Sequence, residues 1–340
     1  MRDARWYIPR APLGDKEKAS QGAAFFVAPN PPFGAVFTYY LRDEVRTRQK
    51  QRREREKEIE KEGRDTPYPG WEELRREELE EDPAIVLTVR DDAGEVVRRV
   101  TGPVTAGFHR VAWDLRYPSP EPWSPEDEEE DWEEWTRGLL AGPGRYTVSL
   151  AHRIDGVLTD LGQTQSFQVV PQGKGTLPGA SPEQLVAWTR ELDSMRRDVG
   201  AAASALDETS KRLAGIREAL MESTGAAGLH DEARALERRL SEMQERLGGN
   251  RTRSRAGDPG PVSVSRRLEV AVDGSLFSTY GPTRTHRESL DIAHREFAAL
   301  RGELDRMIRE ELPALERRLD AAGVPWTPGR GVAGGSSGKR

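Results

Sequence analysis

Three short runs with β-strand character, between Ala84 and Leu115, restrict most strongly what this chain can fold into. In the first and third runs every second position holds an apolar residue. Each run therefore presents one apolar face. Gly94, between the first two runs, sits where a hairpin loop built on a type I turn requires a left-handed residue. The stretch therefore predicts the centre of a small β-sandwich. The residues expected to face its core are Ile85, Leu87 and Val89, followed by Val111, Trp113 and Leu115.

Further strands extend this sandwich to residues 35–170. Ala35–Leu41 precedes the central runs, and a weaker strand candidate, Ala23–Ala28, precedes that. Downstream, one face of Arg145–Leu150 is apolar, and Gln165–Val170 turns Phe167 and Val169 inward. Asp155-Gly156, between these two strands, is a typical two-residue hairpin signal.

Residues 42–82 form a charged insertion between two strands. Its first half, up to Gly63, consists of good helix formers with charge pairs at helical spacing. A short second helix follows from Trp71, and Pro83 ends it. We expect a solvated helical arm. The alternative is a basic docking surface around Arg46–Arg55.

An acidic loop at residues 116–141 interrupts the sandwich. Its tryptophans, Trp123, Trp132 and Trp135, are candidate ligand or partner contacts. No glycine fixes a ligand turn for Ca²⁺, and the spacing matches no EF-hand. A glycosidase needs two carboxylates held about 5–10 Å apart, which an acidic run does not supply. We expect a solvated loop, with weak cation or partner contact as the alternative.

The tail predicts an antiparallel helical bundle over residues 181–323, joined to the sandwich by a Gly/Pro linker at 171–180. Ser181, Pro182 and Gln184 form a helix start with a capping box. From Leu185 to Leu220 apolar residues follow a heptad pattern, so this helix needs a partner, expected from the later helices rather than from a second chain. The last helix is expected from Thr283 to Ala322, and residues 324–340 are predicted to be disordered.

The last helix carries a discontinuity in its apolar seam. After Leu304 the pattern shifts to Ile308 and Leu312, which are two four-residue steps just before Pro313. We interpret this shift as a stutter combined with a proline kink.

Composition favours small cores joined to solvated helices. The 340 residues allow two or three domains; 35% are hydrophobic and 32% charged, with a mean hydropathy of −0.75. A formal charge of −6 does not indicate nucleic acid as a partner. The absence of cysteine excludes disulfides and thiol catalysis. No run approaches the length of a membrane span, and the first residues contain no signal-peptide core.

No catalytic pattern emerges from the reactive residue types. The five histidines include His286 and His294, eight residues apart and therefore too far along one helix to chelate a metal as an i, i+4 pair does. There is no nucleophile elbow, Walker loop or dinucleotide glycine pattern. The sequence predicts no catalytic residue, no metal site and no cofactor.

Several motifs carry a family resemblance. The sandwich segments Val89-Arg-Asp-Asp-Ala-Gly-Glu-Val-Val-Arg98, Ala106–Leu115 and Gly142–Val148 resemble the flagellar-hook-cap type of immunoglobulin-like domain. With Ala28-Pro-Asn-Pro-Pro-Phe-Gly-Ala-Val-Phe-Thr-Tyr-Tyr40 and Pro325–Gly329, nearly the whole chain resembles the C-terminal region of bacterial sortilin-like, Asp-box propeller proteins, often labelled glycosyl-hydrolase-like. The acidic insertion after Trp123 departs from that pattern.

The resemblance implies a propeller upstream of Met1, with residues 1–34 as the end of that upstream domain, and a periplasmic or extracellular location. It carries over no catalytic residue. We therefore expect an α+β, multidomain, non-catalytic accessory region that braces or presents the propeller. Its partner would be that propeller or another protein. The alternative is a carbohydrate-binding or glycoside-hydrolase-associated region, in which the three loop tryptophans stack on a glycan.

Overall fold

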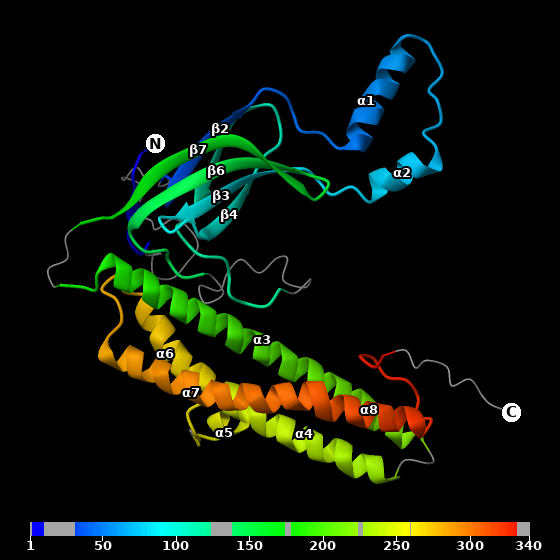
Figure 1. The fold of residues 1–340 in the computed structure, drawn as a ribbon, viewed down its shortest axis with the longest axis vertical. Coiled ribbons are helices and arrows are strands. Elements are labelled where there is room, and N and C mark those ends of the chain that lie inside the picture. Colours follow the sequence, from blue (N-terminus) through cyan, green and yellow to red (C-terminus); the bar gives the residue numbers. More distant parts are fainter. Residues whose placement is uncertain are drawn as a thin grey trace, which may run out of the picture. The chain divides into compact units, whose positions relative to one another are not determined.

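The computed structural model describes residues 2–9, 31–123, 138–173, 178–223, 227–258 and 260–331. The strand candidate Ala23–Ala28, the loop tryptophans Trp132 and Trp135, and the C-terminal residues 332–340 lie outside these ranges. The fold is mixed α+β, as expected (Figure 1). Two compact units divide the described residues. The first draws on residues 1–118 and 137–186, and the second on residues 119–136 and 187–340.

The first unit contains two β-sheets. The larger has the order β1-β7-β6-β3-β4, formed by Ala4–Trp6, Val157–Pro171, Gly144–Ile154, Ala84–Asp91 and Val96–Gly102. All its pairings are antiparallel except that of β1 with β7. The smaller sheet pairs β2 (Ala35–Leu41) with β5 (Gly107–Trp113), also antiparallel.

A single hydrophobic core joins the two sheets. Phe37 of the small sheet meets Phe167 of the large one with ring centroids 5.6 Å apart, and Trp113 lies 5.3 Å from Tyr146. Two of its polar aromatic groups are satisfied within the core, since Trp113 Nε1 donates to the Arg116 carbonyl at 2.9 Å and the Tyr146 hydroxyl donates to the Gly142 carbonyl at 2.6 Å. By contrast, the buried Nε1 of Trp6 has no hydrogen-bond partner among the described residues. The core is therefore built from edge-on aromatic contacts between both sheets.

Both predicted hairpin turns have the expected backbone. Gly94 has φ of 82°, and Asp155 and Gly156 have φ of 50° and 74°, the all-positive pattern of a type I′ turn. Two details of the strands differ from expectation. Val86 and Thr88, whose side chains alternate with those of Ile85, Leu87 and Val89, are buried too, so both faces of the central strand β3 are covered.

Leu115 does not continue the face of its strand. Strand β5 ends at Trp113, and Leu115 takes φ of 59° in a turn that places it in the core with no exposed surface. Leu115 is therefore a core residue, as expected, although it lies beyond the end of the strand from whose alternation this was predicted.

Ala4–Trp6, in the segment expected to close an upstream domain, forms β1 and pairs with Val169–Pro171. Ala4 and Trp6 are both buried in the core of the first unit. A three-residue strand is too short to show a period, which is why the pattern gave no sign of it.

The insertion contains two helices, α1 (Arg48–Lys61) and α2 (Trp71–Glu78), and neither has a buried residue. Ion pairs connect them. The Arg52 guanidinium donates to both oxygens of Glu77, at 2.6 and 2.7 Å, and to Glu56 at 2.6 Å. The arm is therefore held by charge pairing rather than by a core.

Helices make up the second unit. Their bounds are α3 (Pro182–Met221, of which the first turn belongs to the first unit), α4 (Ala227–Gly248), α5 (Arg251–Arg255), α6 (Val264–Leu276), α7 (Arg284–Arg306), a π turn η1 (Met307–Glu311) and α8 (Leu312–Ala321). Helices α4, α6 and α7 pack against one another (Figure 1).

The long first helix begins and packs as predicted. The Ser181 hydroxyl accepts the Gln184 N–H at 3.3 Å, and the Gln184 side chain accepts the Ser181 N–H at 2.9 Å, which confirms the capping box. Every seam residue from Leu185 to Leu220 is buried, including Thr209, whose hydroxyl donates to the Ala205 carbonyl. The heptad pattern therefore serves packing within the chain.

The seam shift near the C-terminus is resolved by a π turn, so the expected stutter is wrong. Met307, not Ile308, is fully buried, and the next buried residue is Leu312. The step from Met307 to Leu312 is five residues, and η1 absorbs the extra one by widening a single turn. Beyond it Pro313 lies in the first turn of α8, where its missing N–H costs least.

Candidate functional site

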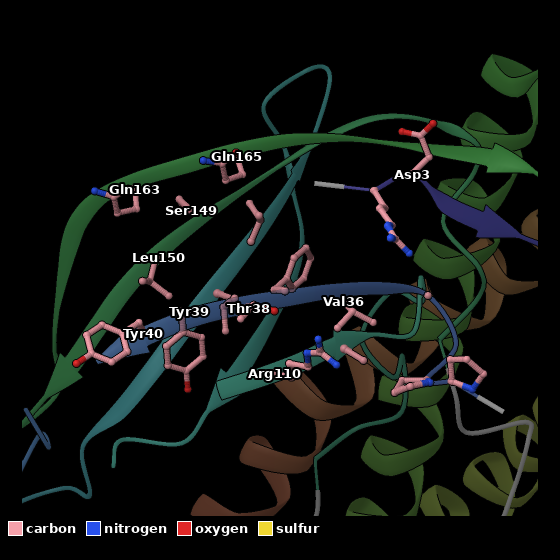
Figure 2. A pocket seen from close by; sticks show the side chains of 18 residues that line it. Asp3, Val36, Thr38, Tyr39, Tyr40, Arg110, Ser149, Leu150, Gln163 and Gln165 are labelled. Atoms are coloured by element: carbon pink, nitrogen blue, oxygen red, sulfur yellow. The ribbon is translucent and has the colours of Figure 1, made fainter. Parts of the chain in front are cut away.

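A groove of about 1260 Å³ runs along β2 in the first unit. One wall is β2 itself, with Arg110 and Ala112 of β5 beside it. The facing wall consists of Ser149 and Leu150 of β6 and Gln163 and Gln165 of β7 (Figure 2). We call this the β2 groove. Its lining also includes Arg2, Asp3, Pro31, Pro32, Gly34, Phe37, Leu87 and Val148.

Strand β2 has one edge with no paired strand among the described residues. Among the described residues it pairs only with β5, over its whole length and without a register shift. Every second N–H and C=O of an edge strand points away from its ladder and is available to another strand. The groove therefore offers main-chain hydrogen-bonding groups as well as side chains.

Unlike the other described edge strands, β2 contains none of the residue types that usually oppose edge-to-edge pairing. Ala35–Leu41 contains no charged residue and no proline. By contrast, β4 carries Arg98 and Arg99, and β1 is only three residues long and contains Arg5. Charge and shortness are the usual means by which proteins block edge-to-edge pairing. The β2 edge is thus chemically suited to accept a strand.

Tyr39 anchors β2 instead of serving as a reactive group. Its hydroxyl donates to the Pro103 carbonyl at 2.6 Å, and burial raises the pKa of this phenol above its usual value. The ring lies against Gly102, where an added Cβ would come within 2.4 Å of the hydroxyl oxygen. Tyr39 therefore stays neutral at physiological pH and is committed to holding the sheet.

The outer face of the small sheet adds exposed aromatic area next to the groove. Tyr40 and Phe108 lie directly opposite each other in the β2–β5 register, with ring centroids 4.9 Å apart. Despite this contact, Tyr40 is 57% exposed and Phe108 is 80% exposed. Val36 lies on the same face of β2 and is also exposed. Exposed apolar groups concentrated on one side of a domain are typical of an interaction surface.

Of the three predicted ligand contacts, only Trp123 lies within the described residues. Trp123 is 85% exposed, belongs to the second unit and is not among the residues that line the β2 groove. Trp132 and Trp135, as noted, lie outside the described residues. Nothing in the sequence indicated the β2 edge. Whether a strand is paired on one side or on both depends on the order of strands in the sheet, which a single stretch of sequence does not reveal.

The alternative of a basic docking surface at Arg46–Arg55 also meets a specific obstacle. Its cations are largely engaged inside the arm: Lys50 with Glu44 at 2.5 Å, Arg52 with Glu77, and Arg46 with Glu54. Cations paired in this way have a weaker residual field for an anionic partner.

Three histidines have structural contacts. His286 completes a capping box at the start of α7, since its Nδ1 accepts the Thr283 N–H at 3.2 Å while the Thr283 hydroxyl accepts the His286 N–H. His109 Nε2 lies 2.6 Å from the Thr105 carbonyl, and His294 lies 3.6 Å from Glu191. No group of acidic and histidine side chains suited to a metal ion occurs within the described ranges.

Comparisons with protein-family models, curated proteins and solved structures found no match to this chain. In the part of the chain that the structure describes, no helix is both long enough and apolar enough to cross a membrane.

Proposed function

We propose that this chain is a non-catalytic accessory and protein-interaction region that engages another polypeptide through the β2 groove. The observation that supports this most directly is the free, uncharged edge of β2 beside exposed Tyr40 and Phe108. In strand addition, main-chain hydrogen bonds supply affinity and alternate side chains supply specificity. The β2 groove offers both kinds of contact.

The composition of the groove favours binding over hydrolysis. Among its described lining residues, Asp3 is the only carboxylate, whereas glycoside hydrolysis by the usual mechanism requires two. The Tyr39 hydroxyl is already bonded to Pro103. The remaining polar groups are amides, hydroxyls and guanidinium groups, which orient a ligand without doing acid–base chemistry at neutral pH.

We further propose the larger setting that the resemblance implies. The two sheets with a shared aromatic core are consistent with an immunoglobulin-like sandwich, and the buried heptad seam is consistent with a helical bundle. Such a region braces or presents a sortilin-like propeller in the periplasm or outside the cell. Its partner is that propeller or another protein chain.

A photo-crosslinking experiment tests the role of the groove. Benzoylphenylalanine replaces Tyr40 in the purified full chain, which is irradiated alone and with a recombinant sortilin-like propeller. Val157, exposed at the start of β7, is the matched control position. We expect crosslinks to a second polypeptide from position 40 at least tenfold above those from position 157. Equal yields at the two positions would refute the interaction.

Enzyme assays test the non-catalytic part of the proposal. Hydrolysis of glycoside substrates by the full chain is expected to stay at the buffer rate. Turnover that scales with the amount of chain and disappears in an Asp3→Asn variant would instead identify the groove as an active site.

A further inference from the structure

The sequence of β2 is suited to pairing with itself. In an antiparallel arrangement centred on Thr38, Thr38 meets Thr38 of the partner subunit and Val36 meets Tyr40 of the partner subunit. Thr–Thr and aromatic–β-branched pairs are among the favourable cross-strand combinations. On the exposed face of β2, therefore, each residue meets a well-matched counterpart.

Charge does not oppose this pairing. Ala35–Leu41 carries no charged side chain, so no like charges face each other across the new ladder. The residue opposite Thr38 on β5 is a cation, Arg110. In a four-stranded arrangement the two Arg110 positions are three strand spacings apart, or about 14 Å. That separation exceeds the Debye length of about 8 Å at physiological ionic strength, so their repulsion is largely screened.

The exposed aromatic groups are continuous with the proposed interface. Tyr40 and Phe108 form a pair on the outer face, and Val36 lies further along the same strand. Self-pairing of β2 places the Tyr40–Phe108 pair of one subunit beside Val36 of the other. The apolar side chains that are open to solvent in one chain would thus share one face of a continuous sheet.

We propose that the occupant of the β2 edge is a second copy of this chain, which forms an antiparallel four-stranded sheet in the order β5-β2-β2-β5 about a twofold axis at Thr38. This inference rests on the proposed function, since it names the polypeptide that the β2 edge accepts. Isologous pairing of this kind closes after two copies and leaves no further free edge at β2. Two attached propellers would then be presented together.

A single engineered cysteine gives a direct test, because the chain has none of its own. Thr38 lies on the proposed axis and its side chain is exposed, so Thr38→Cys leaves the core untouched. Directly opposed residues in antiparallel strands have Cβ atoms about 4.5–5.5 Å apart, which is close to disulfide range. Thr101→Cys, exposed on the edge strand β4, is the matched control.

The expected result is a disulfide-linked dimer from Thr38→Cys under mild oxidation, at least tenfold more abundant than from Thr101→Cys. Sedimentation velocity of the unmodified full chain is expected to show a monomer–dimer equilibrium. In a Thr38→Lys variant the dimer dissociation constant should rise at least tenfold, because two ammonium groups then oppose each other, with an unchanged circular dichroism spectrum as the folding control.

A chain that stays monomeric at all concentrations, with equal disulfide yields at positions 38 and 101, would overturn the dimer. The broader function is judged separately by the Tyr40 crosslinks. Crosslinks to a propeller from a monomeric chain would remove the second copy as occupant and leave the groove as an interaction site. If position 40 crosslinks neither to a propeller nor to a second copy, both the dimer and the interaction site are refuted.

Discussion

Gly34, just before β2, has φ of 100°, and an added Cβ there would lie 1.9 Å from the Trp113 carbonyl oxygen. Both the backbone conformation and the close approach therefore require glycine. We expect Gly34→Ala to destabilise the β unit by about 2–5 kcal/mol, combining backbone strain with overpacking. The measurement is the urea midpoint, followed by near-ultraviolet circular dichroism of the aromatic core.

Gly63 provides the matched control for this substitution. It also has a positive φ, of 70°, but an added Cβ meets nothing within 4 Å. Gly63→Ala is expected to strain only the end of α1 and to leave the near-ultraviolet midpoint unchanged. Equal shifts for the two variants would show that the contact with Trp113 is unimportant.

Asp193 of α3 predicts a pH dependence. Burial raises the pKa of its carboxyl, and the nearby cations Arg197 and Arg196 only partly oppose this effect. Its Oδ1 has no hydrogen-bond partner among the described residues. A raised folded-state pKa means that the folded protein holds the proton more tightly than the unfolded one. This stabilisation is complete below the unfolded pKa of about 3.9 and is lost as pH rises through the folded value.

We therefore expect Asp193→Asn to gain stability relative to the natural chain as pH rises from about 3.5 to about 7. Urea denaturation followed at 222 nm, which reports the helices, measures the difference. Asp198→Asn, whose side chain is 50% exposed, is the control. A difference between Asp193→Asn and the natural chain that is independent of pH would contradict the prediction.

At the scale of elements, the α1–α2 arm is held by the Arg52–Glu77 pair rather than by apolar packing. The hydrogen bond from Arg52 is the main cause that lowers the pKa of Glu77. Removing the guanidinium in Arg52→Met should free the two helices from each other. We expect faster amide exchange in residues 48–78 and unchanged exchange in β3 and β6, measured by mass spectrometry.

The control for the arm is Arg64→Met. Within the described residues Arg64 pairs with Glu62 alone, and both side chains are largely exposed. Its loss should leave exchange in α1 and α2 unaltered, because exposed pairs contribute little. If amide exchange in α1 and α2 is the same in the Arg52→Met and Arg64→Met variants, interactions other than the Arg52–Glu77 pair hold the two helices together.

The π turn η1 predicts that one residue of the last helix can be deleted without loss of packing. Between Leu290 and Leu319 the buried steps are 3, 4, 3, 4, 3, 5, 3 and 4 residues, and only the step across η1 breaks the alternation. Deleting exposed Glu310 restores a four-residue step. Because Pro313 would then lie inside a continuous helix, Pro313→Ala is combined with the deletion. We expect this variant to retain cooperative unfolding and full helicity.

Deleting Gly302, which is exposed in α7, is the matched comparison. That deletion turns Leu304 and everything after it by about 100° around the axis, which moves the seam away from the core. A marked loss of helicity is expected. If both deletions behave alike, the π turn does not carry the extra residue.

At the scale of the whole molecule, self-pairing at β2 links stability to concentration. A dimer that forms only from folded chains raises the unfolding temperature as protein concentration rises. We expect the midpoint of the natural chain to rise over a hundredfold concentration range and that of Thr38→Lys to stay constant. Scanning fluorimetry measures both. A constant midpoint for the natural chain would contradict a dimer at these concentrations.

The sequence by itself determined those features that depend on neighbours along the chain. The capping box at Ser181, the left-handed residues at Gly94 and Gly156, and the buried seam from Leu185 to Leu220 follow from local hydrogen bonding and helical or strand periodicity. These interactions span a few residues, so their pattern is visible in one stretch.

Only the tertiary structure decided the features that depend on which strands lie next to each other. The free edge of β2, the parallel pairing of Ala4–Trp6, the burial of both faces of β3 and the five-residue step at η1 are set by sheet order and by packing between distant helices. An edge strand and a central strand can have the same sequence pattern, because the pattern records which side chains are apolar and does not record which backbone groups are paired. For that reason the candidate interaction site became apparent only when the sheets were assembled.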